Sequence, residues 1–245
     1  MTRCYRSVFR CLPYIGASLQ NRQSEDLDSL YKMQKSIVSK YIDAPSDTHL
    51  TILAADSIFT YFQDKLGQTH YLMFVGDNDT GKTANLRVLQ QIGYRAMLDV
   101  DITAANIYGI LGNFEEGQGI ILEDEADDID RKPEKMKIYK AGYNVGEKVT
   151  RTDITGYGRK TRSWNTFCFK AFTAGNAPDG NAAKGFLDRT FIFHCIRGEL
   201  AYDITEVLNP AGDNDFTELL EELNNSRKLL FAFRLLHYHD LLPNI

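Results

Sequence analysis

The segment Gly76–Thr83 reads GDNDTGKT and fits the pattern G-x-x-x-x-G-K-[ST]. The apolar run His70–Val75 precedes it and is typical of a buried strand, and a helical pattern follows it as far as about Gln91. A strand, a glycine-containing loop and a helix in this order can wrap a phosphate group, because backbone N–H groups and the helix N-terminus point at the anion. The sequence therefore predicts an α/β fold built around an anion-binding loop.

Each constrained position of this loop has a chemical role. Gly81 lets the backbone approach a phosphate, Lys82 reaches the β and γ oxygens of a nucleoside triphosphate, and the Thr83 hydroxyl binds Mg²⁺. The alternative is a surface turn that contains a lysine, and the flanking strand and helix argue against it. We expect ATP and Mg²⁺ as ligands, held by the residues Gly76, Asp77, Asn78, Asp79, Thr80, Gly81, Lys82, Thr83 and Ala84.

The rest of the chain alternates strands and helices. Alternation of this kind favours parallel pairing, with helices on both faces of the sheet. Ser24 is a candidate cap of the first helix, Gly67 ends the second, and the last helix can break near Asn224. Further strands are predicted at 96–100, 119–123, 166–173 and 190–196, and helices at 24–42, 47–66, 103–111, 135–140 and 216–236. We expect a three-layer α/β core over residues 68–200, helices over 24–67 that pack on it, and a C-terminal helical segment over 201–245.

Acidic residues follow the predicted strand 119–123. In the segment GIILEDEAD, Asp124 is placed to hold Mg²⁺ through water and Glu125 to activate the attacking water. A slip of one residue would give these roles to Glu123 and Asp124, but side-chain alternation along a strand can point Glu123 away from the site. A solvated acidic turn is the alternative, because more aspartates follow.

Two further polar residues lie at the ends of predicted strands. Asn176 follows the fourth strand, where it can orient the attacking water, although the NAP sequence is also an ordinary turn. Arg189 begins the last strand, where it can stabilise the charge on a γ-phosphate. An ion pair with Asp188 is the alternative role for this arginine. The candidate catalytic residues are thus Lys82, Glu125, Asn176 and Arg189.

The order of these motifs resembles that of the AAA+-like ATPases. The motifs are GxxxxGKT, an apolar strand before DEAD, a strand ending in asparagine and a DR pair before the last strand. More narrowly, they are similar to the helicase modules of plasmid and viral primase-helicases, including superfamily 3, as is the phrase KAGYNVGEKVTR at 140–151. The resemblance covers about residues 50–197. It implies a mostly parallel five-stranded sheet of strand order 5-1-4-3-2, rings with shared ATP sites, and action of Arg189 on the phosphate of a neighbouring subunit. A primase domain and a winged helix are not evident. A stand-alone motor, a fragment of a larger primase-helicase and a degraded relic of a mobile element all fit the sequence.

Basic residues gather between Gly146 and Trp164. Gly156 and Gly158 can form a hairpin tip, and Tyr157 and Trp164 can stack on bases. Charges of this kind track the phosphates of a nucleic-acid strand, and the position resembles that of a pore-lining hairpin in related ring motors. A solvated charged hairpin is the alternative. The candidate contacts, with single-stranded DNA as the expected partner, are Lys148, Arg151, Arg159, Lys160 and Arg162.

Composition restricts the remaining possibilities. A net charge of -5 over 245 residues does not mark the whole protein as a nucleic-acid binder, so any such surface is local. No apolar run reaches the length that spans a bilayer, so no membrane is expected as a partner. Four cysteines without a CxxC pair indicate free thiols in a reducing, cytoplasmic compartment. The arginine-rich, acid-free residues 1–23 are a poorly packed terminus, a basic arm or an organellar transit peptide.

Three functions fit these observations. The first is an ATP-hydrolysing P-loop motor, helicase-like, that replicates DNA or a mobile element as a homo-oligomeric ring. The second is a P-loop switch that binds protein partners and does not translocate, and DNA-stimulated turnover separates the two. The third is a nucleotide or small-molecule kinase, against which Glu125 and Asn176 argue. A GTPase would need an N-K-x-D motif that reads guanine, and the sequence has none.

Overall fold

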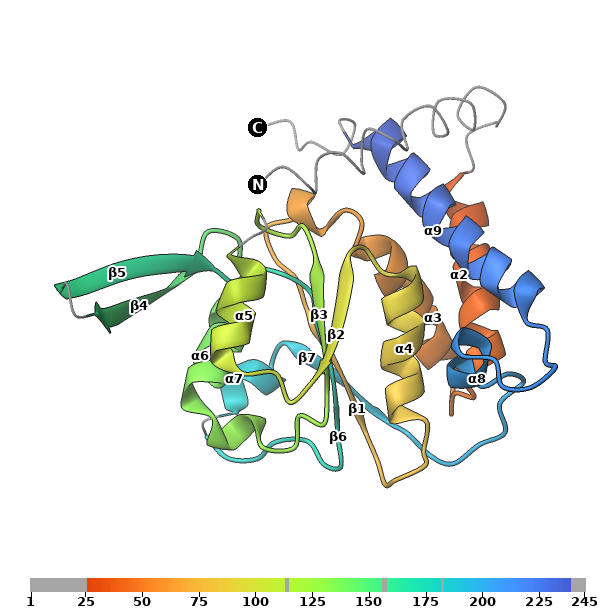
Figure 1. The fold of residues 1–245 in the computed structure, drawn as a ribbon, viewed down its shortest axis with the longest axis horizontal. Helices are drawn as coiled ribbons and strands as arrows, with labels where there is room; N and C mark the ends of the chain where they lie inside the picture. The colour runs from red at the N-terminus through yellow and green to blue at the C-terminus, as the bar shows by residue number, and fades with distance from the viewer. Residues whose placement is uncertain (1–25, 113–114, 156–157, 182, 239–245) are drawn as a thin grey trace.

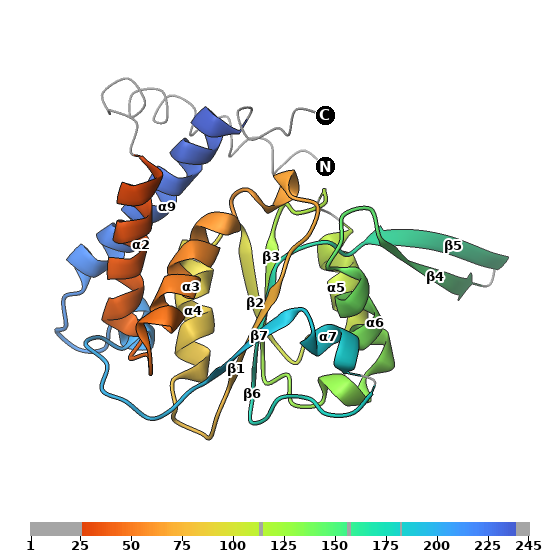
Figure 2. The ribbon, with the colours of Figure 1, turned by 180° about the vertical axis from the view of Figure 1, so that it is seen from behind.

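A computed structural model describes residues 26–238 apart from 113–114, 156–157 and 182. Within these residues a central sheet carries helices on both faces, and a two-stranded hairpin protrudes from one side (Figure 1). The view from behind shows the same three layers (Figure 2). None of the helices in the described part of the chain combines the length and the apolar character that a bilayer crossing requires.

The central sheet is parallel throughout and has the strand order β2-β3-β6-β1-β7. Counted along the chain without the hairpin strands β4 and β5, and read from the β7 edge, this is the predicted order 5-1-4-3-2. Only the numbering differs, because the hairpin lies between the third and fourth sheet strands in sequence. The sheet strands are β1 (Tyr71–Val75), β2 (Ala96–Val100), β3 (Ile120–Asp124), β6 (Lys170–Ala174) and β7 (Thr190–His194).

Side chains of the central strands alternate between two apolar cores. Leu72 and Phe74 of β1 pack on one face, and Tyr71, Met73 and Val75 pack on the other. Strands buried on both faces in this way are apolar along their whole length. The first face is covered by α2 (Leu27–Tyr41), α3 (Asp47–Phe59), α4 (Lys82–Ile92), α8 (Ile204–Leu208) and α9 (Thr217–His237), and the second by α5 (Ala104–Leu111), α6 (Pro133–Ala141) and α7 (Lys184–Leu187).

The N-terminal helices α2 and α3 contribute to the core on the first face of the sheet, and their ends differ from the predicted ones. Asp26 caps α2, because its carboxylate accepts the N–H of Ser29 at 2.7 Å; Ser24 lies outside the described residues. The second helix ends at Phe59 rather than near residue 66, and a 3₁₀ turn, Gln63–Lys65, follows. The side chain of Gln63 is buried there and bonds the backbone of residues 119 and 169, which explains why this segment leaves the helix.

The last helix, α9, is continuous, so the predicted break near Asn224 is wrong. Its middle is held against α2, where Gln34 Nε2 donates to Ser226 Oγ at 2.7 Å. Leu223 and Leu230 are buried on the same helix and anchor it on either side of this bond. Tertiary packing therefore overrides the weak local helix preference of the two asparagines.

The hairpin consists of β4 (Lys148–Thr155) and β5 (Gly158–Asn165), paired antiparallel. The sheet strand after it begins at Lys170 rather than at residue 166. Residues 166–169 instead form the hairpin root, where Cys168 N donates to Gly142 O at 3.4 Å. The buried Lys170 Nζ donates to the carbonyls of Thr166 and Cys168 at 3.0 and 2.9 Å, which ties this connection to the sheet.

Candidate nucleotide site

The predicted phosphate loop joins the carboxyl end of β1 to the N-terminus of α4. Residues 78–84 line a cleft with a volume of about 750 Å³, and residues from the carboxyl ends of β3 and β6 form its opposite wall. Ligands of open α/β sheets bind at this edge, where loops and helix N-termini converge. The topology therefore brings together the motifs that the sequence suggested separately.

Two glycines are required by the shape of this loop. A Cβ atom on Gly76 would lie 2.5 Å from the carbonyl oxygen of Cys195 and 2.9 Å from Thr80 Oγ1, so only glycine fits between them. Gly81 has φ 77°, in the left-handed region, at the residue that precedes α4. Glycine adopts this conformation without steric cost, and it turns the chain into the helix so that N–H groups face the cleft.

Lys82 is the first residue of α4 and lines the cleft. Its Nζ donates to the carbonyl oxygens of Gly76 and Asp77, the second at 3.0 Å. These two contacts hold the ammonium group over the loop. This is the location that a lysine needs to reach the outer phosphates of a bound triphosphate.

The Thr83 hydroxyl and the Asp124 carboxylate meet across the cleft. Thr83 Oγ1 lies 3.0 and 3.2 Å from the two carboxylate oxygens of Asp124. This contact joins the loop after β1 to the carboxyl end of β3, as in phosphate-binding folds that hold Mg²⁺ with a hydroxyl and an aspartate. Together with the parallel strand order, it decides the fold class. The chain has a P-loop NTPase fold.

Thr173, at the end of β6, was not among the predicted site residues. Its hydroxyl donates to Asp124 Oδ1 and accepts the backbone N–H of Glu125 at 3.0 Å. It is 1% exposed and lines the cleft, so one buried side chain orients both acidic residues. The available signal was a hydroxyl residue near the end of the predicted strand 166–173, three residues before the predicted Asn176.

Glu123 is excluded from the cleft, which settles the alternative of a one-residue slip. Its side chain is fully buried and accepts hydrogen bonds from Lys135 Nζ and Tyr139 Oη on α6. Burial raises the pKa of Glu123, and the contacts with Lys135 and Tyr139 oppose this change. Side-chain alternation thus points Glu123 to the opposite face of the sheet from Asp124, as predicted.

Glu125 lines the cleft and is exposed. Its φ of 57° lies in the left-handed region, which costs a side-chain-bearing residue about 1–2 kcal/mol. Such strain persists where surrounding contacts fix the backbone, here the bond to Thr173, and it is common at functional sites. Asp127 also lines the cleft, and its Oδ1 accepts the N–H of Gly175 at 2.6 Å.

The two remaining catalytic candidates lie at opposite ends of the sheet. Asn176 is exposed and follows Gly175, which lines the cleft beyond β6. Arg189 precedes β7 at the amino end of the strands, so it does not reach the loop of its own chain. Its guanidinium donates to Lys140 O and lies 4.7 Å from the ring centre of Tyr143, rather than forming the alternative ion pair with Asp188.

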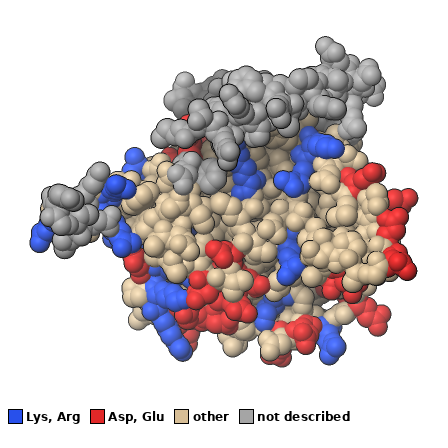
Figure 3. All heavy atoms as spheres, in the orientation of Figure 1, with Lys and Arg blue, Asp and Glu red and all other residues tan. Residues whose placement is uncertain are grey.

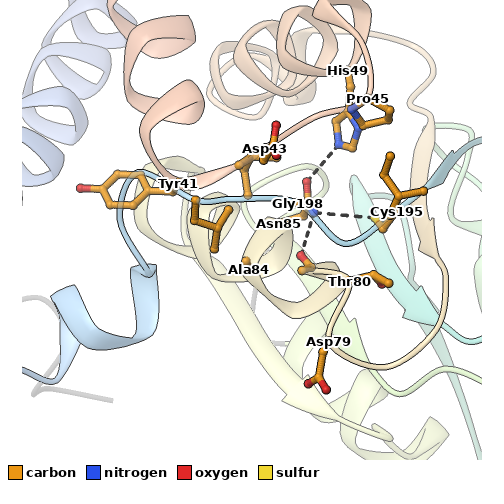
Figure 4. A pocket seen from close by; sticks show the side chains of 14 residues that line it. Tyr41, Asp43, Pro45, His49, Asp79, Thr80, Ala84, Asn85, Cys195 and Gly198 are labelled. Atoms are coloured by element: carbon orange, nitrogen blue, oxygen red, sulfur yellow. Dashed lines mark hydrogen bonds between the residues drawn. The ribbon is translucent and has the colours of Figure 1, made fainter.

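A second, smaller cavity of about 60 Å³ lies beside the phosphate loop (Figure 4). Asn85 Oδ1 lies 3.0 Å from His49 Nε2, and Asn85 Nδ2 donates to Gly81 O at 3.0 Å, which links this cavity to the loop. His49 is 2% exposed, its ring stacks on Phe193, and its Nδ1 has no hydrogen-bond partner among the described residues. Burial lowers the pKa of His49, so the imidazole is neutral near pH 7.

The hairpin divides its basic residues between two faces. Arg151 pairs with Arg162, and Val149 pairs with Trp164 two residues along, so these four share a face. The alternation of side chains assigns Lys148 and Arg159 to the other face, and Lys160 is paired in register with Asp153. Figure 3 shows Lys and Arg side chains on the protruding hairpin, whereas acidic side chains gather lower on the same face of the molecule.

The prediction that Trp164 stacks on bases is wrong. Its ring packs 5.8 Å from that of Tyr108 on α5 and touches Gly112, and the residue is half-buried. Trp164 thus anchors the hairpin to the core. Arg151 is also engaged with the core, because it lies 3.4 Å from Glu134 of α6 and over the ring of Tyr108. Tyr157 and the tip lie outside the described residues.

No protein-family model and no curated protein matches this sequence. Among solved structures, the apo C-terminal region of NrS-1 is 16% identical with a TM-score of 0.43, over 85% of this chain and 45% of that chain. A JCV helicase bound to a small acetamide compound is 13% identical with a TM-score of 0.39, over 86% of this chain and 54% of that chain. The chain spans about half the length of each of these two proteins.

The cysteines that the structure describes, Cys168 and Cys195, are free and buried. Burial raises the pKa of both thiols, to about 11 for Cys195, so neither is a reactive thiolate near pH 7. Cys4 and Cys11 lie outside the described residues, as does the predicted N-terminal arm 1–23.

Proposed function

We propose that this chain binds and hydrolyses ATP and works as a helicase-like motor on single-stranded nucleic acid. The observation that carries the proposal is the contact between Thr83 and Asp124, 3.0 Å apart at the mouth of the cleft. It joins two motifs that are 41 residues apart in sequence, beside a loop whose conformation requires glycine at Gly76 and Gly81.

The residues of the cleft fit a nucleoside triphosphate with Mg²⁺. Mg²⁺ prefers oxygen ligands and is commonly held by one or two carboxylates together with phosphate oxygens. Thr83 Oγ1 and the Asp124 carboxylate supply such ligands, and the loop N–H groups with Lys82 bind the phosphates. When bound, Mg²⁺ neutralises the charge that develops on the transferring phosphoryl group.

Hydrolysis then depends on how the chain places one water molecule. The carboxylate of Glu125 takes a proton from that water, whose oxygen bonds to the γ-phosphorus while the bond to the bridging oxygen breaks, giving ADP and phosphate. Thr173 fixes the backbone of Glu125 for this role. Asn176, next to a residue that lines the cleft, orients the water from the β6 side.

The small cavity beside the loop suits the base of the nucleotide. Residues 79–81 line both this cavity and the phosphate cleft, so one ligand can span the two. His49 Nδ1, which has no hydrogen-bond partner among the described residues, offers a hydrogen-bonding atom on a largely apolar wall, which is how proteins orient a planar base. ATP is the triphosphate that we propose.

A ring of identical subunits completes the site. Arg189 lies at the end of the sheet away from its own cleft, so it can act only on the phosphate of a neighbouring subunit. Reaching that phosphate requires the guanidinium to leave Lys140 O and Tyr143. Arginines supplied in this manner stabilise transition-state charge in many phosphate-transferring enzymes.

The first experiment measures ATP hydrolysis with and without single-stranded DNA for the wild type, Lys82→Ala and Glu125→Gln. We expect DNA to stimulate wild-type turnover, Lys82→Ala to lose nucleotide binding, and Glu125→Gln to bind ATP without turning it over. Tight ATP binding without phosphate release under any condition would contradict the motor and favour a switch. A phosphorylated second product would identify a kinase.

A second experiment tests the hairpin as the nucleic-acid contact. The variant Arg159→Ala/Lys160→Ala/Arg162→Ala should weaken single-stranded DNA binding and lower its salt slope by about 2, because each lost phosphate contact contributes about 0.7. ATP binding should not change. The matched control is Arg227→Ala/Lys228→Ala, which removes exposed charges from α9 on the other side of the molecule. Equal DNA binding by both variants would contradict a hairpin contact.

A further inference from the structure

The phosphate cleft and the hairpin root lie at opposite ends of the sheet. The cleft follows the carboxyl ends of β1 and β3. The root, residues 166–169, is bonded to Gly142 through Cys168 N, and the next residue, Tyr143, accepts the N–H of Thr69 at 3.0 Å just before the amino end of β1. Helix α6 connects the two ends (Figure 1). Its 9 residues span about 14 Å, and the chain runs from its end into the loop before β4.

A buried contact fixes the middle of α6 to the strand that carries Asp124. Glu123 precedes Asp124 on β3, and its carboxylate accepts hydrogen bonds from Lys135 and Tyr139. The two donors are four residues apart, so they lie on the same face of the helix. All three side chains are at most 2% exposed, and Glu123 and Tyr139 are fully buried.

The same helix is held at both of its ends. At the cleft end, Lys132 contacts Asp101 and lies 2.9 Å from Asp128, and both carboxylates line the cleft. Lys135 also lies 3.6 Å from Asp101, so its ammonium group stands between the cleft and Glu123. At the hairpin end, Tyr71 Oη donates to Tyr139 O at 2.6 Å. Glu134, in the first turn of α6, lies 3.4 Å from Arg151 of β4, so the cleft end of the helix also contacts the hairpin directly.

Fold stability alone does not account for a charged pair at this position. A buried ion pair costs desolvation energy that apolar residues of the same volume avoid, so replacement by such residues is often neutral or stabilising. What the pair adds is a defined geometry, because hydrogen bonds are directional and apolar contacts are not. Here that geometry sets the position of α6 relative to Asp124.

We propose that Glu123 is a positioning residue that couples the phosphate cleft to the hairpin: it fixes α6 to the strand end carrying Asp124, so that nucleotide binding shifts the hairpin root. This inference rests on the proposed function of the cleft as a nucleotide site. Glu123 does not touch the nucleotide itself, since it faces the other side of the sheet. Its effect on the cleft and on the hairpin passes through Lys135 and Tyr139.

The test uses the full chain and amide hydrogen exchange with and without Mg²⁺ and a non-hydrolysable ATP analogue. The main variant, Glu123→Met/Lys135→Met/Tyr139→Phe, removes all polar partners of the contact at once and leaves no buried charge unpaired. Tyr139→Phe alone is a milder variant that removes one hydrogen bond, and it serves if the triple variant does not fold. Asp64→Asn is the matched control, because it weakens a buried ion pair with Arg234. This pair holds α9 and belongs to neither the cleft nor the hairpin.

In the wild type we expect the analogue to slow exchange in α4 and to change exchange in β4 and β5 by a factor of about 5 or more, a typical allosteric coupling. In the triple variant α4 should still respond while the hairpin does not, and Tyr139→Phe should reduce the hairpin response. Asp64→Asn should keep both responses. A hairpin that responds in the triple variant, or in Tyr139→Phe, as it does in the wild type would overturn the proposal. So would a wild-type hairpin that stays unchanged while α4 is protected. If α4 itself fails to respond in the wild type, the proposed function is wrong, and the coupling inference is refuted with it.

Discussion

Replacing Thr173 by valine removes the hydroxyl that holds both acidic residues of the cleft and keeps the shape of the side chain. The hydrogen bond to the charged Asp124 contributes about 1.5–3 kcal/mol and the bond from Glu125 N–H about 0.5–1.5 kcal/mol. Asp124 keeps its two contacts with Thr83 and is partly exposed, so water and Thr83 replace part of the loss. We therefore expect Thr173→Val to lower the free energy of unfolding by about 2 kcal/mol.

The assay is urea unfolding, in which the midpoint should fall while the slope stays constant. Thr166→Val is the matched control, because Thr166 is fully buried and its hydroxyl has no hydrogen-bond partner among the described residues. Removing that hydroxyl should be neutral or stabilising. Turnover should fall at least about tenfold in Thr173→Val, since the water-activating Glu125 loses its anchor, and should recover in Thr173→Ser. If Thr173→Val is as stable and as active as Thr166→Val, the assigned role of this hydroxyl is wrong.

Three further changes test other parts of the structure. Glu125→Gly should abolish turnover yet raise the free energy of unfolding by about 1 kcal/mol, because glycine adopts the left-handed conformation without strain; calorimetry that shows destabilisation would contradict the strained backbone. Gly112→Ala, just after the end of α5, should cost about 1–3 kcal/mol in urea unfolding because its Cβ would overlap Trp164. Gly109→Ala, within α5 and with open space around its Cβ, should instead gain about 0.5–1 kcal/mol. As the pH falls below 6.5, the unfolded chain protonates before the buried His49 does, so this residue lowers stability there. His49→Phe should therefore make unfolding less dependent on pH between about pH 7 and pH 5.5, and an unchanged pH dependence would show that His49 is not protected from protonation.

Much of the fold follows from local patterns. The five sheet strands were predicted within a few residues, because apolar runs of this length between turn signals are characteristic of strands buried on both faces. The phosphate loop and the acidic segment that contains Asp124 were predicted for a related reason, since each is a short motif whose own residues are close together in sequence. Glu123 was correctly placed away from the cleft by side-chain alternation alone.

The features that sequence reasoning missed depend on contacts between distant segments. The hydroxyl of Thr173 meets Asp124 across 49 residues, and no local pattern distinguishes it from any other strand threonine. Trp164 of β5 was predicted to stack on bases because its partner Tyr108 lies on helix α5, in a distant part of the sequence. The early end of α3 likewise depends on Gln63, whose Oε1 accepts the N–H of Phe169 at a separation of 106 residues. Such contacts become visible only once the chain is folded.

The pairing of α2 with α9 has a consequence for how the protein folds. From α2, Gln34 meets Ser226 across 192 residues and Lys40 meets Glu222 across 182. Asp64, in the 3₁₀ turn after α3, meets Arg234 of the same helix α9 across 170 residues. During translation, α2, α3 and all the sheet strands are synthesised before α9. The nascent chain therefore exposes Leu30, Ile58 and Phe62, which pack in one cluster with Leu230 in the folded protein. Contacts between residues this far apart in sequence form slowly, and apolar surface that stays exposed until they form favours aggregation. Docking of α9 is therefore the step that buries this apolar surface, and a chain truncated before Thr217 should leave the surface exposed although every residue of the nucleotide cleft is present.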